Sequence, residues 1–478
     1  MSWETVIGLE VHAELSTKSK IFCTCTTAFG GEPNTHVCPV CAGMPGALPY
    51  MNHEVVEFAI KAGLALGCSI TQHCKFDRKN YFYPDLPKAY QVSQLYSPIC
   101  QNGKLEIETN GQKKVINIRE IHIEEDAGKL LHDTKQGVTF VDYNRCGVPL
   151  IEIVSQPDFR SEEEVVAYLE KLREILLYLG ICDCKMQEGS MRADINLSIR
   201  QKGESEFGIR TEMKNMNSFR AIGRAIAFET ERQIEILNSG GQVIQETRRW
   251  DDDKGASFGM RSKENAQDYR YFPEPDLLPM DIDDNWIRRI TEDLPELAHQ
   301  KRIRYMKEFN LSEADANILT SHKNISDLFE EISDNSKVPK EAANLVIGEI
   351  MHLMSKTNTL PENLLLDSSK LSVLICFVLD GKINRNAYKE VVEAVFMTDV
   401  DPEEYILKKG LMMLSDDNVV EEVVDAVLSA NEKSIADYRA GKDKAFGFLV
   451  GQVMKELRGK GNPAVITKIL KEKLDVVL

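Results

Sequence analysis

The spacing of the apolar residues changes along this chain, and that change limits the possible folds more than any other feature. Up to about residue 160, short stretches alternate apolar and polar side chains between many Gly and Pro breaks, as in "KVINIREIHIEED". Alternation with a period of two is typical of strands that bury one face. Few helical stretches intervene, so we expect a largely antiparallel sheet.

Helical periodicity replaces this alternation further along the chain. "SEEEVVAYLEKLREILLYLG" opens with Ser161 and Glu164 in a capping-box pattern and ends at Gly180, and a second helix is expected from about 218 to 237. From about residue 294 the helical pattern dominates. The sequence therefore predicts an α+β class fold whose sheet-rich part is followed by helices.

The chain is long enough for about three domains. We place them at 1–290 (α+β, largely antiparallel sheet), 291–401 (helical) and 402–478 (a small all-helical tail). Hydrophobic residues are 43% and charged residues 28% of the chain, which is ordinary globular composition. The longest apolar run, 371–379, is half of what a membrane span needs, and the N-terminal residues lack signal or transit features. We expect a cytoplasmic protein that does not contact a membrane.

Carboxylates recur on the polar faces of the predicted strands. "TVIGLEVHAEL" places Glu10 and His12 opposite an apolar face, and "REIHIEEDAG" brings Glu124 and Glu125 to a strand end. Glu152 stands alone inside the apolar strand "PLIEIVS", where an unpaired carboxylate is costly. These side chains could meet over one sheet and hold Mg²⁺ with nucleotide phosphates. A network of salt bridges is the alternative.

The stretch "KFDRKNYFYPDLPKAYQVSQ" (75–94) is chemically the richest in the chain. Its Arg78, Lys79 and Lys88 stand among tyrosines and two prolines, which suits binding of a phosphate or a carboxylate. The alternative is a packed surface loop. Further along, Arg192 and Asp194 share a polar strand face in "GSMRADIN", and Lys214 lies on a similar face. These charges could form cross-strand pairs or line the same site as the carboxylates.

Four of the eleven cysteines cluster in the sequence. They follow the pattern C-x-C-x₁₂-C-x₂-C and comprise Cys23, Cys25, Cys38 and Cys41. Two close pairs separated by a loop suit a tetrahedral Zn²⁺, and four thiolates leave no open position, so such a zinc would be structural. Free thiols are the alternative, and His36 is a possible substitute ligand.

The net charge of −17 argues against non-specific nucleic-acid binding by the whole surface. Between Arg439 and Lys473, however, nine basic residues accompany only three acidic ones. This local excess predicts a phosphate-contacting face, with a solvated helical surface as the alternative. The chain contains no P-loop, dinucleotide-binding, zinc-protease or nucleophile-elbow motif.

The order of several motifs resembles one family over essentially the whole chain. These are "GLEVHAEL", "KFDRKNYFYPDLPKAYQVSQ", "IHIEEDAGK", "PLIEIVSQPD", "GSMRADIN" and "ELRGKGNP". The sequence is similar to the B subunits of the tRNA-dependent amidotransferases, and the 75–94 stretch is the most specific match. The resemblance implies a cradle domain of the glutamine-synthetase-like class at 1–290.

The resemblance also implies an activity. The family converts Glu-tRNA(Gln) to Gln-tRNA(Gln) and Asp-tRNA(Asn) to Asn-tRNA(Asn), as a carbon–nitrogen ligase with glutamine as amide donor. The B subunit would use ATP and Mg²⁺ to phosphorylate the side-chain carboxylate of the misacylated tRNA. Ammonia would come from a partner amidase, the A subunit, and a small C subunit would complete the heterotrimer. The sequence does not choose between the two tRNA substrates.

Roles for individual residues follow from the same resemblance. Mg²⁺ would be held by carboxylates and one imidazole, namely Glu10, His12, Glu124, Glu125 and Glu152. Catalytic roles would fall to Lys79, Lys88, Arg192 and Asp194, and ATP contacts to Arg78, Lys79 and Lys214. The tRNA would lie on basic residues of the tail, namely Arg439, Lys442, Lys444, Lys455, Arg458 and Lys460. A non-catalytic tRNA-binding scaffold and a metal-dependent hydrolase are the alternative functions.

Overall fold

The computed structural model describes residues 2–262, 269–413, 417–439, 441–457 and 461–475. The chain divides into two compact units, 1–297 and 298–478. Arg458 and Lys460, two of the predicted tRNA-binding residues, lie outside the described residues.

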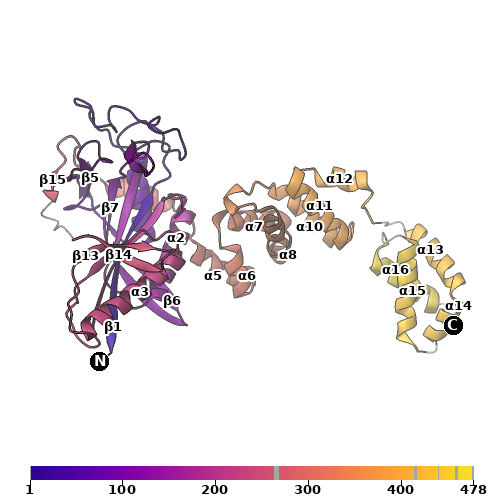
Figure 1. Ribbon diagram of the computed structural model, residues 1–478. Helices are drawn as coiled ribbons and strands as arrows, with labels where there is room; N and C mark the ends of the chain where they lie inside the picture. The colour runs from indigo at the N-terminus through magenta and orange to yellow at the C-terminus, as the bar shows by residue number, and fades with distance from the viewer. Residues whose placement is uncertain (1, 263–268, 414–416, 440, 458–460, 476–478) are drawn as a thin grey trace. The chain divides into compact units, whose positions relative to one another are not determined.

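A nine-stranded sheet organises the first unit (Figure 1). In spatial order its strands are β14 (Ala256–Ser262), β13 (Glu246–Asp251), β12 (Thr211–Lys214), β11 (Met191–Gln201), β1 (Trp3–Glu14), β10 (Pro149–Ser155), β7 (Gln112–Glu125), β6 (Cys100–Thr109) and β2 (Ser69–Ile70). Every neighbouring pair is antiparallel except β12 and β13. The predicted α+β fold with a largely antiparallel sheet is confirmed.

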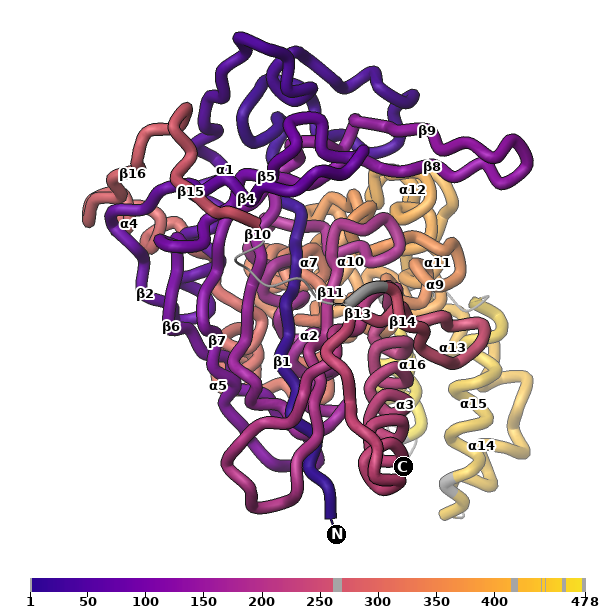
Figure 2. The backbone as a smooth tube through the Cα atoms, turned by 60° about the vertical axis from the view of Figure 1, so that its left-hand side comes forward, coloured from indigo at the N-terminus to yellow at the C-terminus, as the bar shows by residue number. Residues whose placement is uncertain are grey.

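Strand β1 runs through the middle of this sheet, between β10 and β11 (Figure 2). Its alternating sequence explains the position, because Ile7, Leu9 and Val11 are at most 1% exposed on one face. The opposite face carries the polar residues. The hairpin between β6 and β7 turns at Asn110-Gly111, where both residues have positive φ, as a type I′ turn requires.

Three helices cover the apolar face: α1 (His53–Ala65), α2 (Glu162–Leu179) and α3 (Phe219–Asn238). The two predicted helices are present, and α2 is capped by Ser161 and by Gly180 in the left-handed conformation. The capping box is incomplete, because the Glu164 carboxylate accepts from the amide of Arg160 rather than from that of Ser161. Helix α1 lies within a region that the alternation assigned to strands.

A smaller sheet lies on the polar side of the large one. Its strands are β15 (Phe272–Pro273), β4 (Asp77–Asn80) and β5 (Tyr90–Ser93), and β5 contacts β7. The remaining elements of this unit are β3 (His73–Cys74), β16 (Met280–Asp281), α4 (Asp284–Glu292) and the hairpin of β8 (Lys129–Asp133) and β9 (Val138–Asp142). The stretch 75–94, predicted to be a site, thus forms two strands of a second layer above the large sheet.

The second unit is helical. Its first helices are α5 (Ala298–Glu308), α6 (Glu313–Leu319), α7 (Lys323–Ser336), α8 (Pro339–Asn344), the π-helix Leu345–Ile350, α9 (Met351–Thr357), the 3₁₀ turn Pro361–Asn363, α10 (Ser368–Leu379), α11 (Arg385–Thr398) and α12 (Pro402–Lys409). They enclose one apolar core that includes Phe329, Leu374 and Ile406. The last helices, α13 (Asp417–Ala430), α14 (Glu432–Arg439), α15 (Asp443–Glu456) and α16 (Pro463–Asp475), enclose a separate core around Val424, Leu449 and Leu470.

The predicted boundary at 401/402 coincides with the start of α12, where Asp401 caps the helix and Pro402 occupies its first turn. Because Ile406 of α12 packs into the core of the preceding helices, the chain passes from one core to the other after α12 rather than before it. The three-domain division stays a prediction. Among the described residues, no helix is long and apolar enough to cross a membrane.

Candidate functional site

Strand register builds a line of polar side chains across the large sheet. Arg192 on β11 is paired with His12 on β1, His12 with Glu152 on β10, and Glu152 with His122 on β7. Directly paired residues of antiparallel strands project from the same face, so these four side chains lie side by side. The lone Glu152 of the sequence is therefore flanked by two histidines.

Three ligand atoms converge at this line, one each from His12, Glu124 and Glu152, and they lie within 4.8 Å of one another. Nε2 of His12 lies 3.5 Å from Oε2 of Glu152, and Nε2 of His122 lies 2.9 Å from the same oxygen. Burial disfavours the charged form of Glu152, but attraction to both histidines holds its pKa well below the usual range. One imidazole and two ionised carboxylates form a donor set that suits a hard divalent cation.

Glu10 belongs to a neighbouring cluster with Asp194 and Glu212, whose oxygens also lie within 4.8 Å of one another. The ammonium of Lys214 contacts Asp194 and lies 3.3 Å from Glu212. Burial and the carboxylates of Glu152 and Glu212 raise the pKa of Glu10. Four of the five ligands predicted to share one cation site thus divide between two clusters, and Lys214 offsets part of the negative charge of the second.

Glu125, predicted as a ligand of the same cation, points elsewhere. Its Oε1 accepts hydrogen bonds from Nζ of Lys88 at 2.5 Å and from the Val92 amide at 2.9 Å. Its neighbour Glu124 accepts from Ser93 at 2.7 Å and from Gln91 at 3.1 Å, so β5 fixes both side chains. Lys88 is thereby paired with Glu125.

Lys79 is the cation that faces the first cluster. Burial opposes its charge, but Glu124 and Glu152 attract it and raise its pKa. Its Nζ lies 5.3 Å from the ring centre of Tyr269, a cation–π contact. Arg192, in contrast, donates to Asp126 at 2.9 Å, and with Arg145 it lowers the pKa of that buried carboxyl to about 2.

Arg78 was predicted to contact ATP, but its guanidinium is taken up by carboxylates. Nε and Nη2 each lie 2.7 Å from an oxygen of Glu274, and Nη2 lies 2.9 Å from Asp276. This forked geometry uses the donors that a phosphate would need. In this structure Arg78 therefore binds a neighbouring segment of the chain.

The four clustered cysteines come together in the loop after β1. Sγ of Cys41 lies 3.9 Å from Sγ of Cys38 and 4.0 Å from Sγ of Cys25, and all four sulfurs lie within 4.8 Å of one another. Sulfurs bound at about 2.3 Å to a tetrahedral zinc stand about 3.8 Å apart, so the cluster is compatible with a structural metal site. His36 is not part of the cluster. The buried Lys20 lies 3.7 Å from Sγ of Cys41 and adds a positive charge beside the thiolates.

Comparison with known proteins identifies the family of this chain. The family model described as the GatB/GatE catalytic domain matches residues 5–288, and the one described as the GatB domain matches 327–474. The chain belongs to the B-subunit family of the tRNA-dependent amidotransferases.

Named relatives of this family match over nearly their whole length. The B subunit of the aspartyl/glutamyl-tRNA(Asn/Gln) amidotransferase of Lachnoclostridium phytofermentans is 62% identical over 472 residues, which are 99% of each chain. Proteins of the same name from Caldicellulosiruptor saccharolyticus and Agathobacter rectalis are 57% and 55% identical, and the matches cover at least 99% of each chain. The resemblance recognised from the sequence motifs is confirmed.

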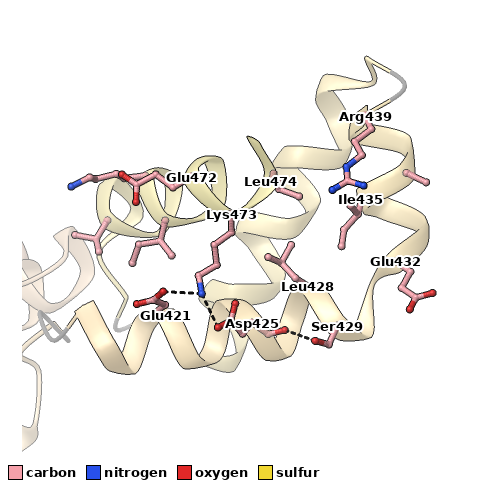
Figure 3. Close-up of a pocket in the computed structure, with 14 residues that line it drawn as sticks. Glu421, Asp425, Leu428, Ser429, Glu432, Ile435, Arg439, Glu472, Lys473 and Leu474 are labelled. Atoms are coloured by element: carbon pink, nitrogen blue, oxygen red, sulfur yellow. Dashed lines mark hydrogen bonds and ion pairs between the residues drawn. The ribbon is translucent and has the colours of Figure 1, made fainter. Parts of the chain in front are cut away.

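The described basic residues predicted to bind tRNA lie in the last helices of this family member. Arg439, Lys442, Lys444 and Lys455 are all exposed, and Lys442 is paired with Asp437 at 2.8 Å. Arg439 borders a groove between α13, α14 and α16 (Figure 3). In that groove Lys473 is paired with Glu421 at 2.8 Å and Asp425 at 2.7 Å, so it is not available to a phosphate in this structure.

Residues 269–276, which include Tyr269, Tyr271, Glu274 and Asp276, were not predicted to belong to the site. Tyr271 is half-buried, and burial raises its pKa to about 12, with a smaller contribution from the carboxylates of Glu124 and Glu152. The stretch "YRYFPEPD" mixes aromatic residues, prolines and charges in the same way as 75–94. That similarity was the signal that could have identified it.

Proposed function

We propose that this chain uses ATP to phosphorylate the side-chain carboxylate of glutamate or aspartate attached to the wrong tRNA. Ammonia then converts the acyl phosphate to glutamine or asparagine. The observation that carries the proposal is the convergence of His12, Glu124 and Glu152 beside Lys79, in a chain whose relatives are named amidotransferase subunits. Burial disfavours ionised carboxylates, and a protein that only binds tRNA would not require two of them beside a cation.

The chemistry explains why such a site is required. Ammonia does not displace oxide or hydroxide from a carboxylate, because both leave poorly. Transfer of the γ-phosphoryl group to a carboxylate oxygen releases ADP and gives an acyl phosphate. Ammonia then adds to the carbonyl carbon, the C–O bond to phosphate breaks, and the amide and inorganic phosphate are released. Phosphoryl transfer depends mainly on positioning and on neutralisation of charge.

We infer that the first cluster holds Mg²⁺. A divalent cation bound there would supply charge neutralisation and a template for the phosphates. His12, Glu124 and Glu152 would be its protein ligands, and Glu10 would lie close enough to assist from the second cluster. Glu125 keeps its predicted role only if it leaves Lys88.

The cations around the clusters would act in two ways. Lys79 would face the transferred phosphoryl group directly, since Glu124 and Glu152 of the cation site attract its ammonium. Lys88, Lys214 and Arg192 are paired with Glu125, Asp194 and Asp126. We propose that these pairs hold the carboxylates in place, and that a phosphate or a substrate carboxylate could reach a cation only by replacing its partner.

We propose that the chain acts as one component of a larger enzyme in the cytoplasm. A partner amidase would release ammonia from glutamine, and a small third protein would complete the complex. The exposed Arg439, Lys442, Lys444 and Lys455 would contact the tRNA backbone, since phosphate contacts dominate nucleic-acid affinity. The four cysteines would bind a structural Zn²⁺ away from the chemistry.

The test is amide formation by the complex with its partner subunits, given Glu-tRNA(Gln), Mg-ATP and ammonium chloride in place of glutamine. Ammonium bypasses the amidase, so the assay isolates the activity proposed for this chain. We expect ATP-dependent Gln-tRNA formation that is lost in Glu10→Ala and in Glu152→Ala, with tRNA affinity unchanged within about threefold. A complex that binds tRNA but forms no product would favour the scaffold. Activity without ATP or tRNA would favour a hydrolase.

A further inference from the structure

Within residues 269–276, Phe272–Pro273 form β15, the outer strand of the small sheet. Phe272 pairs with Arg78 and Pro273 with Asp77, and the Glu274 amide donates to the carbonyl of Phe76 at 2.9 Å. Its described contacts with β4 and with Tyr81 place the segment next to Lys79. We call residues 269–276 the tyrosine strap.

Arg78 of β4 binds the strap through ion pairs. Its guanidinium holds both oxygens of Glu274 at 2.7 Å and reaches Asp276 at 2.9 Å. The guanidinium also stacks 4.2 Å from the ring centre of Tyr90 and 5.7 Å from that of Phe272. Glu274 is only 4% exposed, and Arg78 supplies the opposite charge beside it. A guanidinium that binds a carboxylate through two hydrogen bonds and stacks on a ring is held in one orientation, and lysine cannot reproduce this geometry.

The fastened strap brings tyrosine rings to Lys79. Tyr269 lies with its ring centre 5.3 Å from Nζ of Lys79. Tyr81 and Tyr271 pack edge-to-face against Tyr269, with ring centres 5.8 Å and 6.2 Å away. Lys79 thus has an aromatic ring beside its ammonium, and Glu124 and Glu152 of the first cluster attract the same charge. Rings at this distance attract an ammonium and present an apolar body to the rest of the site.

We propose that the Arg78–Glu274 pair locks the tyrosine strap over Lys79, and that Tyr269 and Tyr271 hold the Lys79 ammonium in place and keep water from the acyl phosphate. Arg78, Glu274 and the two tyrosines are positioning residues that act through Lys79. The inference rests on the proposed function, since it assigns a second task to the same site.

The need for this shielding follows from the chemistry. Water attacking the acyl phosphate regenerates the carboxylate and releases phosphate, so one ATP is lost without an amide. Ammonia attacking the same carbon yields the amide and phosphate. Because water is far more abundant than ammonia, the enzyme must exclude it from the site. The ratio of ATP consumed to amide formed measures how well it does so.

The first experiment compares that ratio in the full complex, with ammonium chloride as nitrogen source. In Tyr269→Leu we expect the ATP consumed per amide to rise about fivefold, since a desolvated cation–π contact and its shielding ring are lost. Tyr269→Phe keeps the ring and should restore the wild-type ratio. The matched control is Tyr50→Leu, because Tyr50 is 77% exposed. An unchanged ratio in Tyr269→Leu would overturn the proposal.

The second experiment tests the fastener without relying on activity. In Glu274→Gln and in Arg78→Lys, amide hydrogen exchange across residues 269–276 should become about tenfold faster, as expected for local opening. Glu206→Gln, at an exposed position, is the control. An unchanged exchange rate in Arg78→Lys would refute the proposal that the Arg78–Glu274 pair holds the strap. This result would stand even if the Glu274→Gln variant failed to fold.

The two experiments separate the inference from the function on which it rests. A wild-type complex that forms no amide with ATP and ammonium would reject the proposed function, while the exchange data would still decide whether Arg78 fastens the strap. A wild-type complex that forms amide normally, with Tyr269→Leu equally well coupled, would reject the shielding role alone.

Discussion

Replacement of Glu229 by glutamine tests how one edge of the nine-stranded sheet is held in place. Glu229 lies on α3 and is fully buried. Its carboxylate accepts from Oγ1 of Thr211 on β12 at 2.8 Å and from Nη2 and Nε of Arg232 at 2.6 and 2.8 Å. Nε of Arg248 on β13 lies 3.4 Å away. One side chain therefore ties α3 to the two strands beside the Glu10 cluster.

The magnitude follows from what glutamine removes. The amide keeps the shape but not the charge, so Arg232 and Arg248 lose a common counter-charge at sites where their side chains are only 21% and 12% exposed. Removal of one partner of a buried ion pair costs about 3–5 kcal/mol. Because both guanidinium groups keep some contact with water and with Glu246, we expect a loss near the lower end, about 3 kcal/mol.

The loss should depend on pH with a defined sign. Burial alone would raise the pKa of Glu229, but hydrogen bonds from Arg232 and Gln233 lower it below its ordinary value. A carboxyl whose pKa is lower in the folded state contributes stability that is present above the unfolded pKa. That contribution is lost as the pH falls through the folded pKa. The difference between wild type and Glu229→Gln should therefore be largest near neutrality and shrink below about pH 4.

Tryptophan fluorescence during urea unfolding reports this unit selectively. The three tryptophans of the chain, Trp3, Trp250 and Trp286, all lie in the first unit, and Trp250 packs against Phe228 of α3. Glu231→Gln on the same helix is the control, because Glu231 is exposed. Equal unfolding midpoints for Glu229→Gln and wild type at neutral pH would refute the reasoning. If the difference in stability between wild type and Glu229→Gln stayed the same at acidic pH, the charge of Glu229 would not be its cause.

Three further predictions concern the sites themselves. Glu152→Gln should weaken Mn²⁺ binding, measured by electron paramagnetic resonance, by at least about tenfold, and unchanged affinity would reject the cation site. The wild-type chain should carry one zinc by elemental analysis and Cys41→Ser should lose it, whereas Cys376→Ser should not; a wild type without zinc would favour free thiols. The double variant Lys444→Glu/Lys455→Glu should bind tRNA more weakly, and the slope of log binding constant against log salt concentration should correspond to about two fewer phosphate contacts. An unchanged slope would show that these two lysines do not contact the tRNA.

Local sequence was sufficient for the elements of the first unit that carry the site. The alternation in β1 predicted which of its side chains are buried, because a half-buried strand has only one way to arrange them. Ser161 and Gly180 predicted the ends of α2, because capping depends on the few residues at each helix end. The four cysteines could be grouped for the same reason, since their spacing alone brings two pairs within a short loop.

The partners of the charged residues could not be predicted from the sequence, because these contacts join residues far apart in the chain. The sequence predicted ATP contacts for Arg78 and Lys214 and catalytic roles for Lys88 and Arg192, with cross-strand pairs as the alternative for Arg192 and Lys214. In the fold each of these four cations is paired with a carboxylate. The partners of Arg78 lie almost 200 positions away in the chain, in a segment that the motifs did not highlight. A cation's availability depends on which opposite charge stands beside it, and that neighbour is selected by strand pairing.

The sequence by itself thus determined the family, the fold class and the residue types of the site, because periodicity, helix caps and motifs depend on residues that are close together in the chain. Only the tertiary structure decided that Glu10 and His12 serve two adjacent clusters, and that Lys79 is the cation facing the first of them. The physical reason is register: antiparallel pairing places Asp194 beside Glu10 and Glu152 beside His12, and that choice is made across the sheet rather than along the chain.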